Sequence, residues 1–193
     1  MRAFIAIDLP LEIKDHLGRI EEKLKASAAD VKWVSPANIH LTLKFLGEID
    51  AQKKASLIRI IEDIAKDKNA FSLRLSSAGA FPNIKYPRVI WIGIDEGSAE
   101  VLKIAEELEE KIEKIGIPKE TREFSSHITI GRVKSGLHRL KLTEGIEEIN
   151  KELGEKLLEL PAGKITLFKS TLSPKGPAYE PLHETSLQKI VSQ

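Results

Sequence analysis

The apolar and polar residues of this chain show two periodicities, one typical of strands and one typical of helices. Strands show short apolar runs or strict alternation, whereas amphipathic helices place apolar residues three or four positions apart. These patterns predict strands at residues 4–8, 31–34, 39–46, 71–77, 89–94, 124–130, 165–172 and 179–191. They predict helices at residues 11–25, 51–66, 98–115 and 142–158.

Glycine and proline mark the boundaries between several of these elements. Gly47 is expected to end the third strand, and residues 81–86, which hold a proline and an asparagine, are expected to form an edge piece or loop. Gly145 and Gly154 weaken the case for a continuous fourth helix. The third helix is expected to bury one apolar face, formed by Val101, Leu102, Ala105, Leu108, Ile112 and Ile115.

The order of these elements favours an α+β fold. Several strands follow one another without a helix between them and carry apolar residues on one face, a pattern typical of antiparallel or mixed sheets. No linker rich in proline, glycine or serine and no low-complexity tract divides the sequence. We therefore expect residues 1–193 to form a single domain.

One short motif occurs twice in the chain. His-Leu-Thr-Leu at residues 40–43 and His-Ile-Thr-Ile at residues 127–130 share the order histidine, aliphatic, threonine, aliphatic, and they lie 87 residues apart. An extended segment precedes each motif, and a glycine and then a helix follow it. Two related lobes that each donate one such strand are the simplest architecture that explains the duplication.

Strand geometry predicts where the side chains of both motifs point. Residues i and i+2 of a strand project from the same face. His40 and Thr42 therefore share one face, while the neighbouring aliphatic residues, with Phe45 or its neighbours, are expected on the other. By the same rule His127 and Thr129 share a face. Unpaired polar groups are costly to bury, so two polar faces that meet across a cleft would explain both strands.

Arg132 follows the second motif and is a candidate phosphate ligand. Strict alternation would place Arg132 on the face opposite to His127. A bulge or strand exit at Gly131 would turn it back toward that histidine. We expect Arg132 and the hydroxyls of Thr42 and Thr129 to bind the non-bridging oxygens of a phosphate.

The two motif histidines suit acid–base chemistry near neutral pH. Opening a cyclic phosphodiester with water needs one group that takes a proton from water and one that protonates the leaving ribose oxygen. Histidine, whose ordinary pKa is near ~6.5, can do both. Either histidine alone could simply be hydrogen-bonded at a strand edge, but two matching copies among five histidines favour the functional interpretation. His16 and His138 are expected in solvent, and His183 at the surface more than in the cleft.

Composition excludes several kinds of site. The chain has no cysteine, which rules out disulfides, thiolate metal sites and cysteine nucleophiles. It has no glycine-rich phosphate loop, no nucleotidyl-transfer motif of the Lys-x-Asp-Gly type and no carboxylate cluster beside the histidines. We therefore expect a reaction without metal, ATP or another cofactor. Abundant lysine and glutamate with a single methionine are typical of a heat-adapted protein.

The formal net charge of +1 gives no general attraction to nucleic acid, so such contacts must come from local clusters. The cationic candidates for a phosphate-attracting rim are Lys32, Lys44, Arg132, Lys134, Arg139 and Lys175. The aromatic candidates for base stacking, most of which core packing would also explain, are Trp33, Phe45, Phe81, Tyr86 and Trp91. No apolar run approaches the ~20 residues of a membrane span. Asp8 and Pro10 interrupt the first segment too early for a signal peptide, so we expect a cytoplasmic protein.

Four segments of the sequence resemble a known family. They are residues 4–10, residues 38–48 around the first motif, residues 127–132 with the second motif, and residues 172–180. On these segments the chain is identified as a member of the two-histidine phosphoesterase superfamily. It resembles in particular the 2′-5′ RNA ligase (RNA 2′,3′-cyclic phosphodiesterase) family, over nearly its whole length.

The resemblance implies a bilobed fold with pseudo-twofold symmetry and a central cleft that holds both histidines. It implies metal-independent hydrolysis of 2′,3′-cyclic phosphate ends of RNA to 2′-phosphates, with His40 as the proton donor and His127 as the proton acceptor. The reverse reaction would join a 5′-hydroxyl end through a 2′-5′ link without ATP. The partners would be RNA ends, with tRNA halves among the candidates, and we expect a monomer.

Two other interpretations are open at this point. A non-catalytic module that binds nucleotides or RNA ends would keep the cleft without turnover, although binding alone does not require two titrating groups. A structural protein whose histidines are merely packed would hold the two rings buried and far apart.

Overall fold

The computed structural model describes residues 1–155, 158–174 and 176–189. Its strands are β1 (Arg2–Asp8), β2 (Val31–Trp33), β3 (His40–Glu48), β4 (Phe71–Phe81), β5 (Val89–Ile94), β6 (His127–Val133), β7 (Leu158–Ala162), β8 (Lys164–Ser173) and β9 (Gly176–Ser186). Its helices are α1 (Leu11–Lys25), α2 (Ala51–Lys66), α3 (Ser98–Glu113) and α4 (Arg139–Glu155), with a 3₁₀ turn, η1 (Pro36–Asn38). Lys175, the helix end predicted at residues 156–157 and the strand end predicted at residues 190–191 lie outside the described residues.

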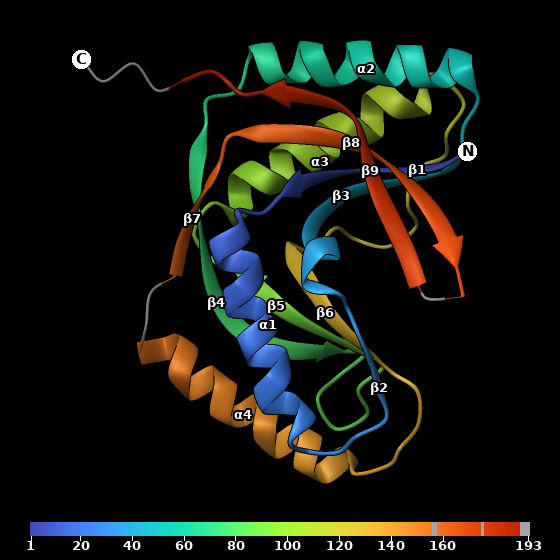
Figure 1. Ribbon diagram of the computed structural model, residues 1–193. Coiled ribbons are helices and arrows are strands. Elements are labelled where there is room, and N and C mark those ends of the chain that lie inside the picture. The colour runs from blue at the N-terminus through green and yellow to red at the C-terminus, as the bar shows by residue number, and fades with distance from the viewer. Residues whose placement is uncertain (156–157, 175, 190–193) are drawn as a thin grey trace.

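The described strands form one sheet with a narrow seam in the middle. Their order is β7-β4-β5-β6-β3-β1-β8-β9, with β2 paired along β6, and every ladder between these strands is antiparallel. At the seam, β3 and β6 share one residue pair, Leu41 opposite Ile128. The seam divides the sheet into two lobes, which can be followed in Figure 1. The predicted bilobed α+β class is confirmed.

A repeated unit builds both lobes. The units β1-α1-β3 and β5-α3-β6 have the same order, and their elements start 87 residues apart, at Arg2 and Val89, Leu11 and Ser98, and His40 and His127. The strand that follows the first β-α-β unit, β4, pairs with β5 in the other lobe. Its counterpart in the second half, β8, pairs with β1. Each lobe therefore contains strands from both halves of the sequence.

Helices cover one face of each lobe. In Figure 1, α1 and α4 pack on the lobe of β4, β5 and β6, whereas α2 and α3 pack on the lobe of β3, β1 and β8. The aliphatic residues of the two motifs point toward these helices, and Leu41 and Ile128 are fully buried. One continuous apolar cluster extends through both lobes. No helix in the described part of the chain is long and apolar enough to cross a membrane.

Several element boundaries differ from the sequence prediction because of contacts that are distant in the sequence. β4 continues to Phe81 because its last residues pair with β5. β3 continues through Gly47, which adopts a φ of 67°, and β6 begins at His127 rather than at residue 124. β7, which pairs with β4, was not predicted. α4 is continuous through Gly145, where a β-carbon would lie 3.2 Å from the side chain of Leu24 in α1.

The prediction for one residue of α3 was wrong. Leu102 is 37% exposed, and Ile104 takes its place in a buried stripe that also holds Val101, Ala105 and Leu108. Successive residues of a helix are rotated by about 100°, so burial of Val101 turns Leu102 toward the edge of the packed face. There it lines the cleft described next.

Candidate active site

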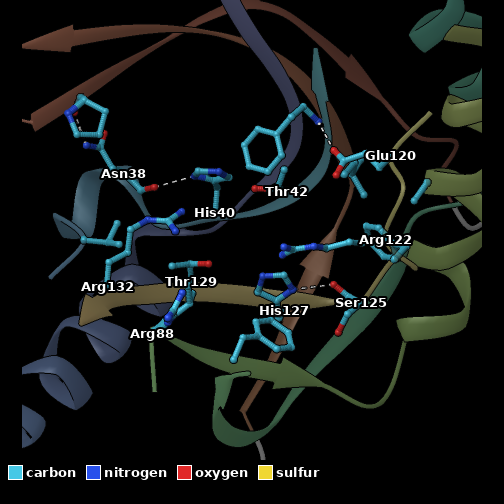
Figure 2. A pocket seen from close by; sticks show the side chains of 18 of the residues that line it. Asn38, His40, Thr42, Arg88, Glu120, Arg122, Ser125, His127, Thr129 and Arg132 are labelled. Atoms are coloured by element: carbon cyan, nitrogen blue, oxygen red, sulfur yellow. Dashed lines mark hydrogen bonds between the residues drawn. The ribbon is translucent and has the colours of Figure 1, made fainter. Parts of the chain in front are cut away.

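A cleft of about 1940 Å³ lies between the two lobes. Strands β3 and β6 contribute its floor, and the segments before β5, before β6 and around the β8–β9 turn contribute its walls. The five candidate site residues all line it, namely His40, Thr42, His127, Thr129 and Arg132. Figure 2 shows these side chains projecting from the two strands into the same space. The structure therefore brings the predicted set together.

The ring of His40 is fixed by a main-chain hydrogen bond. Its Nδ1 donates to the carbonyl oxygen of Asn38 at 2.7 Å, as the dashed line in Figure 2 marks. A carbonyl can only accept, so Nδ1 carries a proton and Nε2 is the nitrogen left for a ligand in the cleft. Phe4 lies 4.7 Å from the His40 ring centroid, and Tyr179 meets the ring edge-on at 5.3 Å. Phe168 stacks behind Phe4 at 5.2 Å.

His127 has an equivalent environment in the other half of the chain. Its Nδ1 donates to the carbonyl oxygen of Ser125 at 2.8 Å, so Nε2 is again the free nitrogen. Phe81 meets the His127 ring edge-on at 5.0 Å, and Trp91 lies 5.4 Å from Phe81. These supports follow the repeat, because Trp91 lies 87 residues after Phe4 and Phe168 lies 87 residues after Phe81. Each histidine is thus held by a carbonyl two residues earlier and by an aromatic pair.

Burial lowers the pKa of both histidines, and the surrounding charges then differ between them. At His40, the main-chain hydrogen bond and the charge of Asp8 act to raise the pKa, while Lys14 acts to lower it. Asp8 and Lys14 form an ion pair of 2.7 Å beside this ring. At His127, the main-chain hydrogen bond raises the pKa, and the charge of Arg132 lowers it. His127 alone of the two therefore faces an arginine that favours its neutral form.

A bulge in β6 turns Arg132 into the cleft. In the β5–β6 ladder Trp91 lies opposite Thr129 and Ile90 lies opposite Gly131, so Ile130 is an extra residue without a partner. One extra residue reverses the alternation beyond it, which places Arg132 on the same side as His127. The glycine after the bulge is required for packing, because a β-carbon on Gly131 would lie 2.9 Å from the Val31 side chain of β2.

A matching bulge in β3 reverses two of the sequence predictions. Ala6 lies opposite Thr42 and Ile5 opposite Lys44, which leaves Leu43 as the extra residue. Phe45 was expected on the apolar face, but the bulge directs it into the cleft with 55% of its surface exposed. Lys44 was a candidate for the phosphate-attracting rim, yet it is turned away from the cleft and is 1% exposed.

The buried Lys44 side chain connects β3 to the segment that leads into β6. Its Nζ donates to both carboxylate oxygens of Glu109, at 2.7 Å each, and to the carbonyl oxygen of Pro118 at 3.0 Å. The Glu120 amide donates to the same Glu109 carboxylate at 3.3 Å. This network fixes the start of the wall that carries Arg122 and Ser125 toward His127.

Two arginines that line the cleft were not selected from the sequence. Arg88 directly precedes β5, and Arg122 lies in the irregular segment before β6. Figure 2 shows both beside the motif residues, Arg88 near Thr129 and Arg122 near His127. Neither belongs to a recognisable motif, although the position of Arg88 one residue before a predicted strand was an available signal.

The remaining candidates divide between the cleft and other places. Lys32 and Lys134 line the cleft, whereas Arg139 lies over the ring of Tyr86, 4.5 Å from its centroid. Trp91 packs against Gly79, where a β-carbon would overlap its ring. The other aromatic candidates line the cleft, namely Trp33, Phe45, Phe81 and Tyr86. The other histidines, which are His16, His138 and His183, do not line it.

Among the described residues, no three histidine, aspartate or glutamate side chains are placed together to hold a metal ion. The motif histidines supply two such ligands at most, and each already commits one ring nitrogen to a carbonyl. A reaction without metal stays a prediction.

The antiparallel bilobed fold, with one histidine–threonine strand from each half of an internal repeat, defines a two-histidine phosphoesterase. The family described as LigT like Phosphoesterase matches the chain twice, over residues 7–91 and residues 92–179, and the chain belongs to this family. The two matches meet within β5, the first strand of the second repeat unit.

Curated relatives and solved structures agree with this family. An RNA 2′,3′-cyclic phosphodiesterase of Methanocaldococcus jannaschii is 39% identical over 95% of this chain and 99% of its own length. One of Methanothermobacter thermautotrophicus is 36% identical over 93% of this chain and 95% of its own length. The crystal structure of TT0787 of Thermus thermophilus has a TM-score of 0.80, with 28% identity over 98% of this chain and 100% of that one. Escherichia coli LigT complexed with 3′-AMP has a TM-score of 0.74, with 25% identity over 96% and 97%.

Proposed function

We propose that this chain is an RNA 2′,3′-cyclic phosphodiesterase that converts a cyclic phosphate end to a 2′-phosphate. The observation that carries the proposal is the paired geometry of His40 and His127 in one cleft. Both rings commit Nδ1 to a carbonyl and leave Nε2 for a ligand. The names of the curated relatives, which match nearly the whole chain, support the choice of substrate.

In the proposed reaction, His127 accepts a proton from water and His40 donates one to the leaving oxygen. The water oxygen forms a new bond to phosphorus, the bond from phosphorus to O3′ breaks, and O3′ leaves as a hydroxyl. Burial lowers the pKa of both rings; beyond it, Arg132 favours the neutral form of His127, as a base requires, whereas at His40 Asp8 favours the protonated form, as an acid requires, against the opposing charge of Lys14. These charges support the assignment that the family resemblance implied.

Thr42, Thr129 and Arg132 bind the phosphate in this proposal. Their side chains line the cleft on the same side as the histidines. Hydroxyl and guanidinium donors stabilise the charge that the non-bridging oxygens carry as the attacking bond forms. Loss of one of these donors should therefore weaken both binding and rate.

The same two histidines would allow ligation in the same roles. A ribose 5′-hydroxyl would replace water as the nucleophile, with His127 taking its proton while the bond from phosphorus to O3′ breaks and His40 protonates O3′, and the product would be a 2′-5′ linkage. The cyclic phosphate already holds the energy for this step, so ATP is not needed. RNA fragments with such ends, tRNA halves among them, are candidate substrates.

The test is single-turnover cleavage of an RNA with a 2′,3′-cyclic phosphate, in EDTA and without ATP. His40→Ala and His127→Ala should each lower the rate by ~10²–10⁴-fold, with a smaller loss of affinity for the RNA end. The double variant should lower the cleavage rate little more than either single variant does, because the two residues act as a unit. His183→Ala is the matched control, since His183 does not line the cleft.

Two results would contradict the proposal. If the double histidine variant cleaved at the wild-type rate, His40 and His127 would not be the catalysts. If the wild-type protein bound the RNA end but turned it over in neither direction, the cleft would belong to a non-catalytic binding module.

A further inference from the structure

Basic side chains gather at one end of the cleft. Lys32, Arg88, Arg132 and Lys134 all line it and are all exposed. Lys32 lies directly opposite Arg132 in the β2–β6 ladder, and Val89, the neighbour of Arg88, lies opposite Arg132 on the other side. The β-carbons of directly opposed residues are about 5 Å apart, so these side chains are neighbours. Figure 2 shows Arg88 and Arg132 at the same end of the site.

No carboxylate neutralises this basic cluster in the described part of the chain, where none of its four members forms an ion pair. Asp30 contacts this basic cluster through its main-chain oxygen, which accepts a hydrogen bond from the Lys134 amide. Four neighbouring cations repel one another, and they make no ion pair that would help the fold. An anionic ligand would relieve this repulsion.

The other end of the cleft has the opposite charge. Its carboxylates come from α3 and from the segment before β6, and they are Glu106, Glu109, Glu110, Glu120 and Glu123. Two cations lie among them, Lys119 and Arg122. Lys119 is paired with Glu113 outside the cleft at 3.3 Å, and Glu109 is paired with the buried Lys44 at 2.7 Å. Figure 2 places the guanidinium of Arg122 near His127. A chain of phosphates would be repelled at this acidic end and attracted at the basic one.

We propose that Lys32, Arg88 and Lys134 form a second phosphate-binding subsite, which holds the phosphodiesters on the 5′ side of the terminal nucleotide. This inference rests on the proposed function. A 2′,3′-cyclic phosphate occupies the 3′ end of an RNA, so all the rest of the strand is attached on the 5′ side. With the reacting phosphate beside Arg132, the strand leaves the cleft across β2 and β6 and away from the α3 carboxylates.

The subsite makes oligonucleotides better substrates than mononucleotides. A mononucleoside 2′,3′-cyclic phosphate reaches the histidines but has no further phosphodiester for Lys32, Arg88 and Lys134. A hexanucleotide with the same end gains those contacts, so its kcat/KM should be higher at low salt. Each phosphate contact to a single strand contributes about 0.7 to the slope of log affinity against log salt.

The test compares these two substrates in a triple variant, Lys32→Ala, Arg88→Ala and Lys134→Ala. The matched control is Arg59→Ala, Lys103→Ala and Lys151→Ala, which removes the same charge from exposed positions of α2, α3 and α4 that do not line the cleft. Because the subsite variant loses about three phosphate contacts, its kcat/KM for the hexanucleotide should fall by about ten-fold or more. Its kcat/KM for the mononucleotide should fall far less. Its salt slope for the hexanucleotide should be shallower by about 2. The control should resemble the wild-type protein in both.

Equilibrium binding separates this inference from the proposed function. A hexanucleotide product with a 2′-phosphate end, bound to the His40→Ala protein, reports on the subsite without turnover. Weaker binding in the subsite variant, but not in the control, supports the subsite even if no substrate is hydrolysed. The inference is overturned if the two triple variants bind alike, or if both substrates lose the same factor in the subsite variant.

Discussion

At the scale of single residues, the two histidines share their hydrogen-bonding geometry but not their charges. Nδ1 of each donates to a carbonyl two residues earlier, which fixes the same tautomer in both rings. The charge of Arg132 acts on His127, whereas Asp8 and Lys14 act on His40. The repeat therefore supplies two similar rings with a pKa lowered by burial, and the charges beside them differ.

The first prediction concerns the pH dependence of kcat/KM. Burial lowers the pKa of both histidines, so the acidic limb, which reports the base of the free enzyme, should lie below pH ~6.5. Arg132→Gln removes a positive charge that disfavours protonated His127, so the pKa of His127 should rise and the acidic limb should move to higher pH. The rate should also fall at every pH, because a phosphate ligand is lost.

Arg88→Gln is the control for this experiment. It removes a cleft arginine that does not contribute to the lowered pKa of His127, so the acidic limb should stay in place. The pair titrates with macroscopic values, so the measurement is the position of each limb and not an assignment to one ring. A shift of the alkaline limb alone in Arg132→Gln would reverse the proposed roles.

At the scale of elements, single extra residues decide which side chains enter the cleft. Leu43 in β3 and Ile130 in β6 have no partner in their ladders. Beyond each bulge the alternation is reversed, so the residues five positions after the histidines, Phe45 and Arg132, share their face. The two halves thus present an aromatic ring at one equivalent position and a cation at the other.

The second prediction tests the bulged strand through Lys44. Lys44→Met removes a buried cation and leaves Glu109 without its partner, while the side chain keeps a similar length. Breaking a fully buried pair costs about 3–5 kcal/mol, and Glu109 is partly exposed, so we expect about 1–3 kcal/mol. The segment before His127 should also lose its anchor, which should lower kcat/KM. Urea denaturation and single-turnover kinetics measure the two effects.

The exposed pair of Lys164 and Glu184 provides a matched control. Lys164→Met should cost under ~1 kcal/mol, as exposed pairs do, and should leave kcat unchanged. The double variant Lys44→Met with Glu109→Leu should recover part of the lost stability, because no unpaired carboxylate remains. Equal losses for Lys44→Met and Lys164→Met would show that the buried network has no special role.

At the scale of the whole molecule, the two lobes are built from exchanged strands. β4 belongs to the first half of the sequence but pairs with β5, and β8 belongs to the second half but pairs with β1. One apolar cluster also extends through both lobes. Neither half of the sequence therefore contains a complete lobe, although the family matches each half separately.

The third prediction is that residues 1–193 unfold as one domain. Unfolding in urea should give a single transition, with coincident curves from far-ultraviolet circular dichroism and from tryptophan fluorescence. Residues 1–87 expressed alone should not fold, because β4 would lack its partner β5. Two separated transitions, or a cooperative transition in the isolated half, would contradict the single domain.

The sequence by itself determined most of the elements and the paired motif. Helices α1 and α2 and strand β5 have the predicted bounds, because apolar periodicity is a local property that these segments express without interruption. The histidine and threonine of each motif share a face for the same reason. Duplication of the motif then implied two lobes and one cleft, and all five candidate residues line that cleft.

The tertiary structure alone decided the bulges, the direction of Lys44 and the place of Arg88. A bulge depends on how a strand pairs with partners from distant parts of the sequence. The alternation of residues within β3 therefore could not show that Lys44 turns away from the cleft and Phe45 turns into it. Arg88 lies in the cleft because β5 pairs with β6, and these two strands are about 40 residues apart in the sequence. Periodicity fixes which face of an element is apolar, but only the register between elements fixes which polar groups meet.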